Sequence, residues 1–149
     1  PPPPPPPPLF HREPGNRDWS VTGVQTCALP ICTIGGPARL GQIFTYKPTS
    51  ADAGELELIA ESQPGSLLQN ADNLTLAPWG DLVVCEDTSG HCGLVGIRPD
   101  GSQYPVGDNT YTSSELAGVC FSPDGEIMFV NIPYPGMPLA ITGDWRVFQ

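Results

Sequence analysis

The chain has 149 residues, and its 16 acidic and 6 basic side chains give a formal net charge of -10. This charge argues against a nucleic-acid partner, because the phosphates would be repelled. No stretch of 18 or more apolar residues occurs, so we expect no membrane-spanning segment. The acidity is compatible with cation binding.

The first 32 residues differ in composition from the rest of the chain. They hold half of the 20 prolines, including residues 1–8, and carry no net charge. Residues 21–31 resemble one reading frame of a common sequencing adaptor, and a homopolymer of cytosine would encode the proline run. A natural polyproline linker would give the same run. We predict that residues 1–32 are a non-native, disordered segment, to be set aside from fold reasoning.

Strand patterns begin at residue 41. Residues 41–48 alternate in side-chain character and end at a proline, and the sequence ELELIAE at residues 55–61 follows after a polar, glycine-containing link. This arrangement predicts a β-hairpin. Residues 92–106 repeat the same pattern with a shorter loop, so a second hairpin of this kind is expected there.

A second type of hairpin occurs twice, at residues 72–86 and again 45 residues downstream at residues 117–131. Apolar positions and turn residues coincide when the two segments are superimposed. The matched pairs are Leu74 and Val119, Leu76 and Phe121, Pro78 and Pro123, Gly80 and Gly125, Leu82 and Ile127, and Val84 and Phe129. A repeat of this length with short strands around a Pro/Gly turn is typical of a β-propeller.

The two hairpin types alternate along the chain, and a final strand is expected near residues 140–142. No window shows helical apolar spacing, so the sequence predicts an all-β fold. We predict that residues 33–149 form a C-terminal fragment of a propeller. It would hold about two four-stranded blades of a larger ring, since four to eight blades are needed for closure.

Polar side chains stand where the strands of these hairpins begin and end. Asp72 and Asn73 enter the first repeated hairpin, Glu86 and Asp87 leave it, and Glu115 precedes the next. Hairpin geometry places such positions at one edge of the blades, where Asn131 would lie as well. Crowded carboxylate and amide oxygens suit calcium. Alternatively, Asp and Asn stand there because they tolerate turn geometry and solvent.

Three cysteines lie downstream of residue 32. Cys85 and Cys120 fall inside apolar strand patterns, which predicts buried free thiols. A disulfide between Cys85 and Cys92 is the alternative if the protein is exported. The sequence leaves this choice open.

Three segments of the chain, DNLTLAPWGDLVVCED, SELAGVCFSPDGEIMFVNI and AITGDW, resemble the C-terminal part of the PhoX family of bacterial alkaline phosphatases. The similarity extends over about residues 35–145. It implies an exported β-propeller phosphoesterase whose site combines calcium and iron. In that family, carboxylates and a cysteine hold the metals at one end of the central channel.

The resemblance also assigns residues. Glu86, in the CED motif, and Glu115, in SELAG, match acidic positions of the family, and we expect both to be metal ligands. Asp72 and Asn73 match the family's DN pair and join the predicted metal-binding set. The ligand cysteine is not transferred to Cys85, whose strand position indicates packing. No catalytic residue is assigned.

The implied activity is metal-dependent hydrolysis of small phosphomonoesters in the periplasm or outside the cell, by a protein that is monomeric when complete. Because several blades are missing, we expect this chain to be inactive alone. The alternative is a non-phosphatase calcium-binding propeller, either a lactonase-like hydrolase or a binding scaffold, since a fold does not fix a function.

Overall fold

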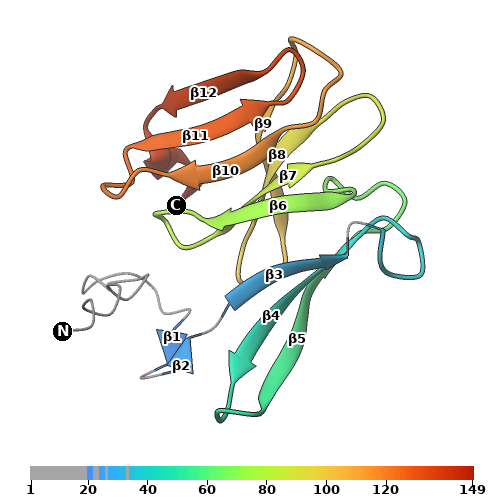
Figure 1. Cartoon of the computed structure of the whole chain (residues 1–149), viewed down its shortest axis with the longest axis vertical. Helices are drawn as coiled ribbons and strands as arrows, with labels where there is room; N and C mark the ends of the chain where they lie inside the picture. Colours follow the sequence, from blue (N-terminus) through green and yellow to red (C-terminus); the bar gives the residue numbers. More distant parts are fainter. Residues whose placement is uncertain (1–19, 22–23, 26, 33) are drawn as a thin grey trace, which may run out of the picture.

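The computed structural model describes residues 20–21, 24–25, 27–32 and 34–149, with side chains from residue 34 onward (Figure 1). Its elements are strands apart from one short 3-10 helix, so the all-β prediction is confirmed. The strands are β1 (Ser20–Val21), β2 (Val24–Gln25), β3 (Cys27–Cys32), β4 (Gln42–Pro48), β5 (Gly54–Glu61), β6 (Ala71–Leu76), β7 (Leu82–Glu86), β8 (Gly93–Ile97), β9 (Gln103–Asp108), β10 (Ala117–Phe121), β11 (Ile127–Ile132) and β12 (Met137–Thr142). The 3-10 helix η1 spans Trp145–Phe148. Within these residues no helix is long and apolar enough to cross a membrane.

Three antiparallel sheets form the body of the fold. The four-stranded sheet β6-β7-β8-β9 lies between the three-stranded sheets β3-β4-β5 and β10-β11-β12, while β1 and β2 form a small ribbon (Figure 1). In each sheet, consecutive strands are neighbours. One complete four-stranded blade flanked by two partial ones fits the predicted partial propeller.

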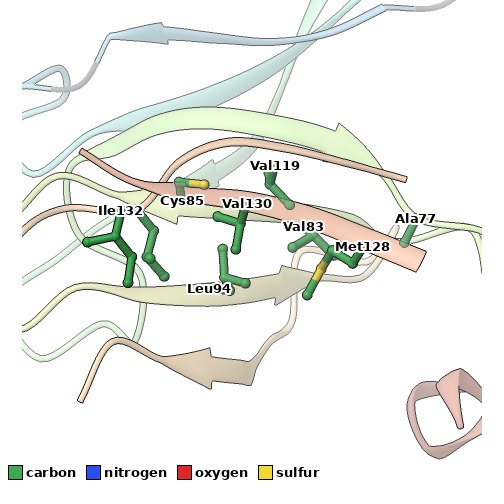
Figure 2. Packing of buried hydrophobic residues seen from close by; sticks show 9 residues of the cluster. Ala77, Val83, Cys85, Leu94, Val119, Met128, Val130 and Ile132 are labelled. Carbon is green, nitrogen blue, oxygen red and sulfur yellow. The ribbon is translucent and has the colours of Figure 1, made fainter. Parts of the chain in front are cut away.

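The middle sheet is buried on both faces. All five residues of β7 are buried, and successive side chains in a strand point to opposite faces. Leu82 and Val84 therefore pack toward the β3-β4-β5 sheet. Val83 and Cys85 pack toward the β10-β11-β12 sheet (Figure 2). These two apolar clusters hold the three sheets together.

The two repeated hairpins differ by one residue in their turns. In the first turn, the backbone N–H of Ala77 donates to the carbonyl of Asp81. In the second turn, the N–H of Ser122 donates to the carbonyl of Ile127, so this turn is one residue longer. Glu126 is therefore an insertion relative to the first hairpin, and the following strands are offset by 46 residues instead of 45.

This insertion corrects the sequence alignment of the second strands. A shift of one residue moves a side chain to the other face of a sheet. Met128, and not Ile127, takes the place of Leu82 in the core. Phe129 points outward with 40% of its surface exposed, and its cross-strand neighbour Cys120 is exposed as well. The predicted burial of Cys120 is therefore wrong.

The turns of the middle and last sheets are joined by aromatic packing. The Trp79 ring stacks on Trp145 at 5.8 Å and on Phe148 at 5.2 Å, measured between ring centroids. Its indole N–H donates to the Tyr104 hydroxyl at 2.8 Å, and that hydroxyl donates to the buried Asp81 carboxylate at 2.7 Å. These contacts fix the turns at this edge of the two sheets.

The predicted non-native segment, residues 1–32, falls mostly outside the described residues. Its described part includes β3, whose backbone pairs with β4. Strands pair through backbone N–H and C=O groups, and every residue except proline has both. The pairing of β3 therefore does not depend on which side chains it carries. The non-native origin and the disorder of this segment stay predictions.

Candidate functional site

Three carboxylates stand at or beside strand ends, on the edge opposite the aromatic turns. We call Asp72, Asp87 and Glu115 the acidic rim. The pKa of Glu115 is raised, first by partial burial and then by the negative charges of Asp87 and Asp72. The charges of Asp72 and Asp87 thus reach Glu115, although the three side chains are not close enough to hold one metal ion. Asp72 and Glu115 belong to the predicted metal-binding set, and Asp87 was expected at the same edge but was not assigned as a ligand.

Local structure explains how the acidic rim forms. The β6–β7 register shifts between Ala71 and Asn73, which places Asp72 in a bulge of the edge strand β6, where it is exposed. Bulges often re-aim a side chain near functional sites. Asp87 follows directly after β7, and Glu115 lies in the link before β10. The sequence indicated the place of Asp87 at this edge, because Asp87 follows Glu86 directly at the end of a strand.

Cys85 lies in the core next to the acidic rim. Burial raises the pKa of its thiol to about 12, a backbone hydrogen bond with Val119 lowers it in part, and the charges of Asp72 and Glu115 raise it further. A thiol with this pKa stays protonated at neutral pH. Cys85 packs within the apolar cluster near Val119 and Val130 (Figure 2), as expected from its strand position.

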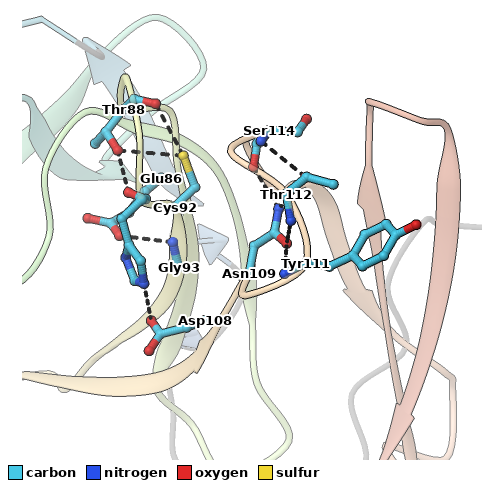
Figure 3. A network of polar contacts seen from close by, with 10 residues as sticks. Glu86, Thr88, Cys92, Gly93, Asp108, Asn109, Tyr111, Thr112 and Ser114 are labelled. Carbon is cyan, nitrogen blue, oxygen red and sulfur yellow. Dashed lines mark hydrogen bonds and ion pairs between the residues drawn. The ribbon is translucent and has the colours of Figure 1, made fainter.

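Glu86 is in a different environment from the acidic rim. It is only 7% exposed. One carboxylate oxygen accepts the backbone N–H of Gln69 at 2.8 Å, and the other accepts that of Gly93 at 3.1 Å (Figure 3). Burial raises its pKa, and the two backbone hydrogen bonds oppose this shift. Glu86 thereby connects the segment before β6 to the start of β8.

Glu86 also lies on the other face of the sheet from Cys85. It follows Cys85 directly in β7 and is paired with Ala71 of β6, which belongs to the cluster facing the β3-β4-β5 sheet. The structure thus separates Glu86 from the neighbourhood that Cys85 shares with Asp72 and Glu115. Its role as a metal ligand stays a prediction.

Three other polar residues of this edge lie outside the acidic rim. Asn73 is paired with Cys85 in the β6–β7 register. The Asn131 amide donates to the carbonyl of Ala117 at 3.2 Å. His91 is exposed, with its Nε2 3.9 Å from an Asp108 carboxylate oxygen.

Cys85 and Cys92 are both free and buried, so the structure shows no disulfide between them. The Cys92 thiol donates to the carbonyl of Thr88, with its Sγ 3.3 Å from that oxygen (Figure 3). The alternative of a Cys85–Cys92 bond is therefore not realised. Both residues behave as small apolar side chains.

The acidic rim does not form a complete metal centre. Among the residues that the structure describes, no three His, Cys, Asp or Glu side chains come close enough to hold one metal ion. Asp72, Asp87 and Glu115 supply the oxygen ligands that hard cations prefer. Their arrangement fits part of a cation site and does not fit a whole one.

Comparisons with known proteins give one match. A family model described as alkaline phosphatase PhoX matches residues 37–136, which is about two thirds of the chain. The matched segment contains both repeated hairpins and all three residues of the acidic rim. Searches of curated proteins and of solved structures found no match.

Proposed function

This chain belongs to the alkaline phosphatase PhoX family, and we propose from this premise that it is part of a metal-dependent phosphomonoesterase. Its acidic rim would be one wall of the metal site. The observation that carries this proposal is the family match over residues 37–136, which includes all three residues of the acidic rim. A cation placed among neighbouring carboxylates offsets the repulsion between their negative charges.

The chemistry of the substrate supports the same assignment. A phosphomonoester carries negative charge that must be neutralised during hydrolysis, and metal ions such as the calcium and iron of this family supply that positive charge when bound. Carboxylates alone would repel the substrate. The acidic rim would therefore serve to bind cations, and the rest of the ligand set would come from outside the described residues.

We further propose a small phosphomonoester as the substrate and the periplasm or the extracellular space as the compartment. The family's exported phosphatases support both. Calcium sites of extracellular proteins work at roughly 0.1–1 mM calcium, a range that suits a partial, exposed carboxylate site. We propose that the complete protein is a monomer, because a closed ring of blades leaves no sheet face uncovered.

Calcium binding tests the acidic rim. We expect the purified chain to bind calcium with a dissociation constant of about 1 mM, and we expect Glu115→Gln to weaken binding at least about fivefold by removing one charge. Because the pKa of Glu115 is raised, this residue is protonated at a higher pH than an ordinary glutamate. As the pH is lowered, the calcium affinity should therefore begin to fall earlier. Isothermal titration calorimetry between pH 5 and pH 8 measures both effects.

Glu126→Gln is the matched control. Glu126 is exposed in the turn between β10 and β11, at the opposite edge of the sheet, and its removal changes the net charge by the same amount. Equal affinities for the wild type and both variants would show that calcium responds only to net charge, and would contradict a site at the acidic rim.

Phosphatase activity tests whether the chain is sufficient. We expect no hydrolysis of p-nitrophenyl phosphate by the purified chain supplied with calcium and iron, because its described residues do not complete a metal centre. Turnover that scales with protein concentration and is lost in Glu115→Gln would contradict this expectation. Hydrolysis of a lactone without any phosphatase activity would favour the lactonase-like alternative.

A further inference from the structure

A pocket opens at the same edge of the sheets as the acidic rim. Its volume of about 640 Å³ lies within the range of small-molecule sites. One wall is the link between β9 and β10, and the other is the loop between β11 and β12. We call it the tyrosine pocket, and its lining residues are Tyr111, Thr112, Ser113, Ser114, Tyr134 and Pro135.

The wall formed by the β9–β10 link is fixed by one buried side chain. Asn109 is only 7% exposed. Its amide nitrogen donates to the Thr112 hydroxyl at 3.1 Å and to the Ser114 carbonyl at 2.8 Å (Figure 3). Its amide oxygen accepts the backbone N–H groups of Tyr111 and Thr112, each at 3.1 Å. The link is therefore shaped by its own hydrogen bonds, and a ligand would not have to order a flexible loop.

Two further hydrogen bonds join the opposite wall to this link. The backbone N–H of Tyr134 donates to the Ser114 hydroxyl at 3.2 Å, and the Thr112 hydroxyl donates to the Tyr134 carbonyl at 3.4 Å. The two walls thus hold each other at a fixed spacing. Both walls lie within the described residues, so the pocket does not need a further blade to form.

The two tyrosine side chains of the pocket are not used by the fold. Tyr111 is 68% exposed and Tyr134 is 81% exposed. Within the described part of the chain, neither phenol hydroxyl has a hydrogen-bond partner. Figure 3 shows the Tyr111 side chain extending from the link, away from Glu86. A tyrosine ring offers a flat apolar surface and a polar tip, a combination that is common at binding surfaces.

The chemistry of the lining indicates which group the pocket takes. All six lining residues are uncharged, and the exposed Ser113 hydroxyl is the polar group between the two tyrosines. Flat aromatic rings stack favourably on tyrosine rings. Hydroxyl groups beside them can bond the polar edge of such a ring. The lining therefore suits a neutral aromatic ring that carries polar groups.

The tyrosine pocket adjoins the acidic rim. Ser114 lines the pocket and Glu115 follows it directly, so their Cα atoms are about 3.8 Å apart. A phosphomonoester has two parts with different needs. Its phosphate requires positive charge, which cations at the acidic rim would supply, and its organic group requires apolar contact.

We propose that the tyrosine pocket binds the aromatic ring of an organic phosphate, such as the base of a nucleoside monophosphate, while the phosphate faces cations at the acidic rim. The place of the phosphate rests on the proposed function. The ring site does not rest on it, because it requires only Tyr111, Tyr134 and the link that Asn109 fixes.

Neutral adenosine tests the ring site without metal or phosphate. We expect adenosine to shift the backbone NMR signals of Tyr111, Ser113 and Tyr134, with a dissociation constant of about 1 mM. Tyr111→Leu and Tyr134→Leu should each weaken binding about two- to tenfold, because each removes one stacking ring. Both side chains are exposed and the hydrogen bonds of Tyr134 use its backbone, so these variants should stay folded.

Two controls separate ring stacking from other causes. Phe129→Leu removes an exposed aromatic ring outside the pocket and should bind adenosine like the wild type. Ribose has no aromatic ring and should not shift the pocket signals. Benzyl alcohol distinguishes the two sources of a ring: affinity equal to that of adenosine would assign the pocket to aryl phosphates in general, and weaker affinity would assign it to nucleotides.

Adenosine monophosphate tests the connection to the acidic rim. Without calcium it should bind more weakly than adenosine, because its phosphate meets a strongly acidic chain. Calcium at about 5 mM should raise its affinity above that of adenosine. Glu115→Gln should reduce this gain at least about threefold and leave the affinity for adenosine unchanged.

Three results would overturn the proposal. The first is an absence of shifts at Tyr111 and Tyr134 with about 20 mM adenosine. The second is equal adenosine affinity in the wild type and both tyrosine variants. The third is a calcium effect on adenosine monophosphate that is the same in the wild type and in Glu115→Gln. Failure of the proposed function is distinguishable, because calorimetry would then show no calcium binding at the acidic rim while adenosine still bound in the pocket.

Discussion

Replacement of Ile97 by alanine is expected to lower the free energy of unfolding by about 2–5 kcal/mol. Ile97 has no exposed surface and belongs to the cluster between the middle sheet and the β3-β4-β5 sheet. Removal of three carbon atoms there loses their burial and leaves a cavity that the rigid sheets on either side cannot close. Urea denaturation followed by tryptophan fluorescence measures the change.

Ile34→Ala is the control for this loss, because Ile34 is 57% exposed and the same atoms are removed. We expect Ile34→Ala to change stability by no more than about 0.5 kcal/mol. A similar loss for both variants would mean that the effect comes from the unfolded chain, and it would contradict the central role of this cluster.

The strands could be predicted from the sequence because their signals are local. Alternation of apolar side chains and turn residues identified the hairpins that became β4–β5, β6–β7, β8–β9 and β10–β11. The last strand was expected near residues 140–142 and begins earlier, at Met137. Pro138 lies within this strand, which is at the edge of its sheet, where proline is tolerated.

Register across the second turn could not be predicted, because one inserted residue leaves the local pattern almost unchanged. Ile127 and Met128 are both apolar, so either could follow the turn into the core. The hydrogen bond from the Ser122 N–H to the Ile127 carbonyl closes a turn that is one residue longer, and this turn places Met128 in the core. The outward position of Phe129 follows from this single inserted residue.

The candidate site could be predicted only in part, because some of its contacts depend on the path of loops. Hairpin geometry placed the strand ends at one edge, and the charges of Asp72 and Asp87 do reach Glu115 there. The partners of Glu86 are backbone groups at Gln69 and Gly93, in loops whose path the sequence does not show. A carboxylate at the end of a buried strand is expected to have a partner, but its residue type cannot reveal whether the partner is a cation or a backbone N–H.

Glu86→Ala is expected to destabilise the fold by about 3 kcal/mol, because two backbone N–H groups lose their acceptors in a buried setting. Glu86→Gln keeps one acceptor oxygen and should lose about half as much. Glu57→Ala, on the exposed part of β5, is the control and should be close to neutral. Urea denaturation at pH 7 compares the three variants.

The pH dependence separates this structural role from metal binding. Because the pKa of Glu86 is raised in the folded state, the folded chain holds its proton more tightly than the unfolded chain. Its contribution to stability is therefore full below the ordinary glutamate pKa and falls as the pH rises through the raised value. Glu86→Gln cannot ionise and should lack this component. If Glu86→Ala instead abolished calcium binding while leaving stability unchanged at every pH, Glu86 would be a metal ligand and not a connection between loops.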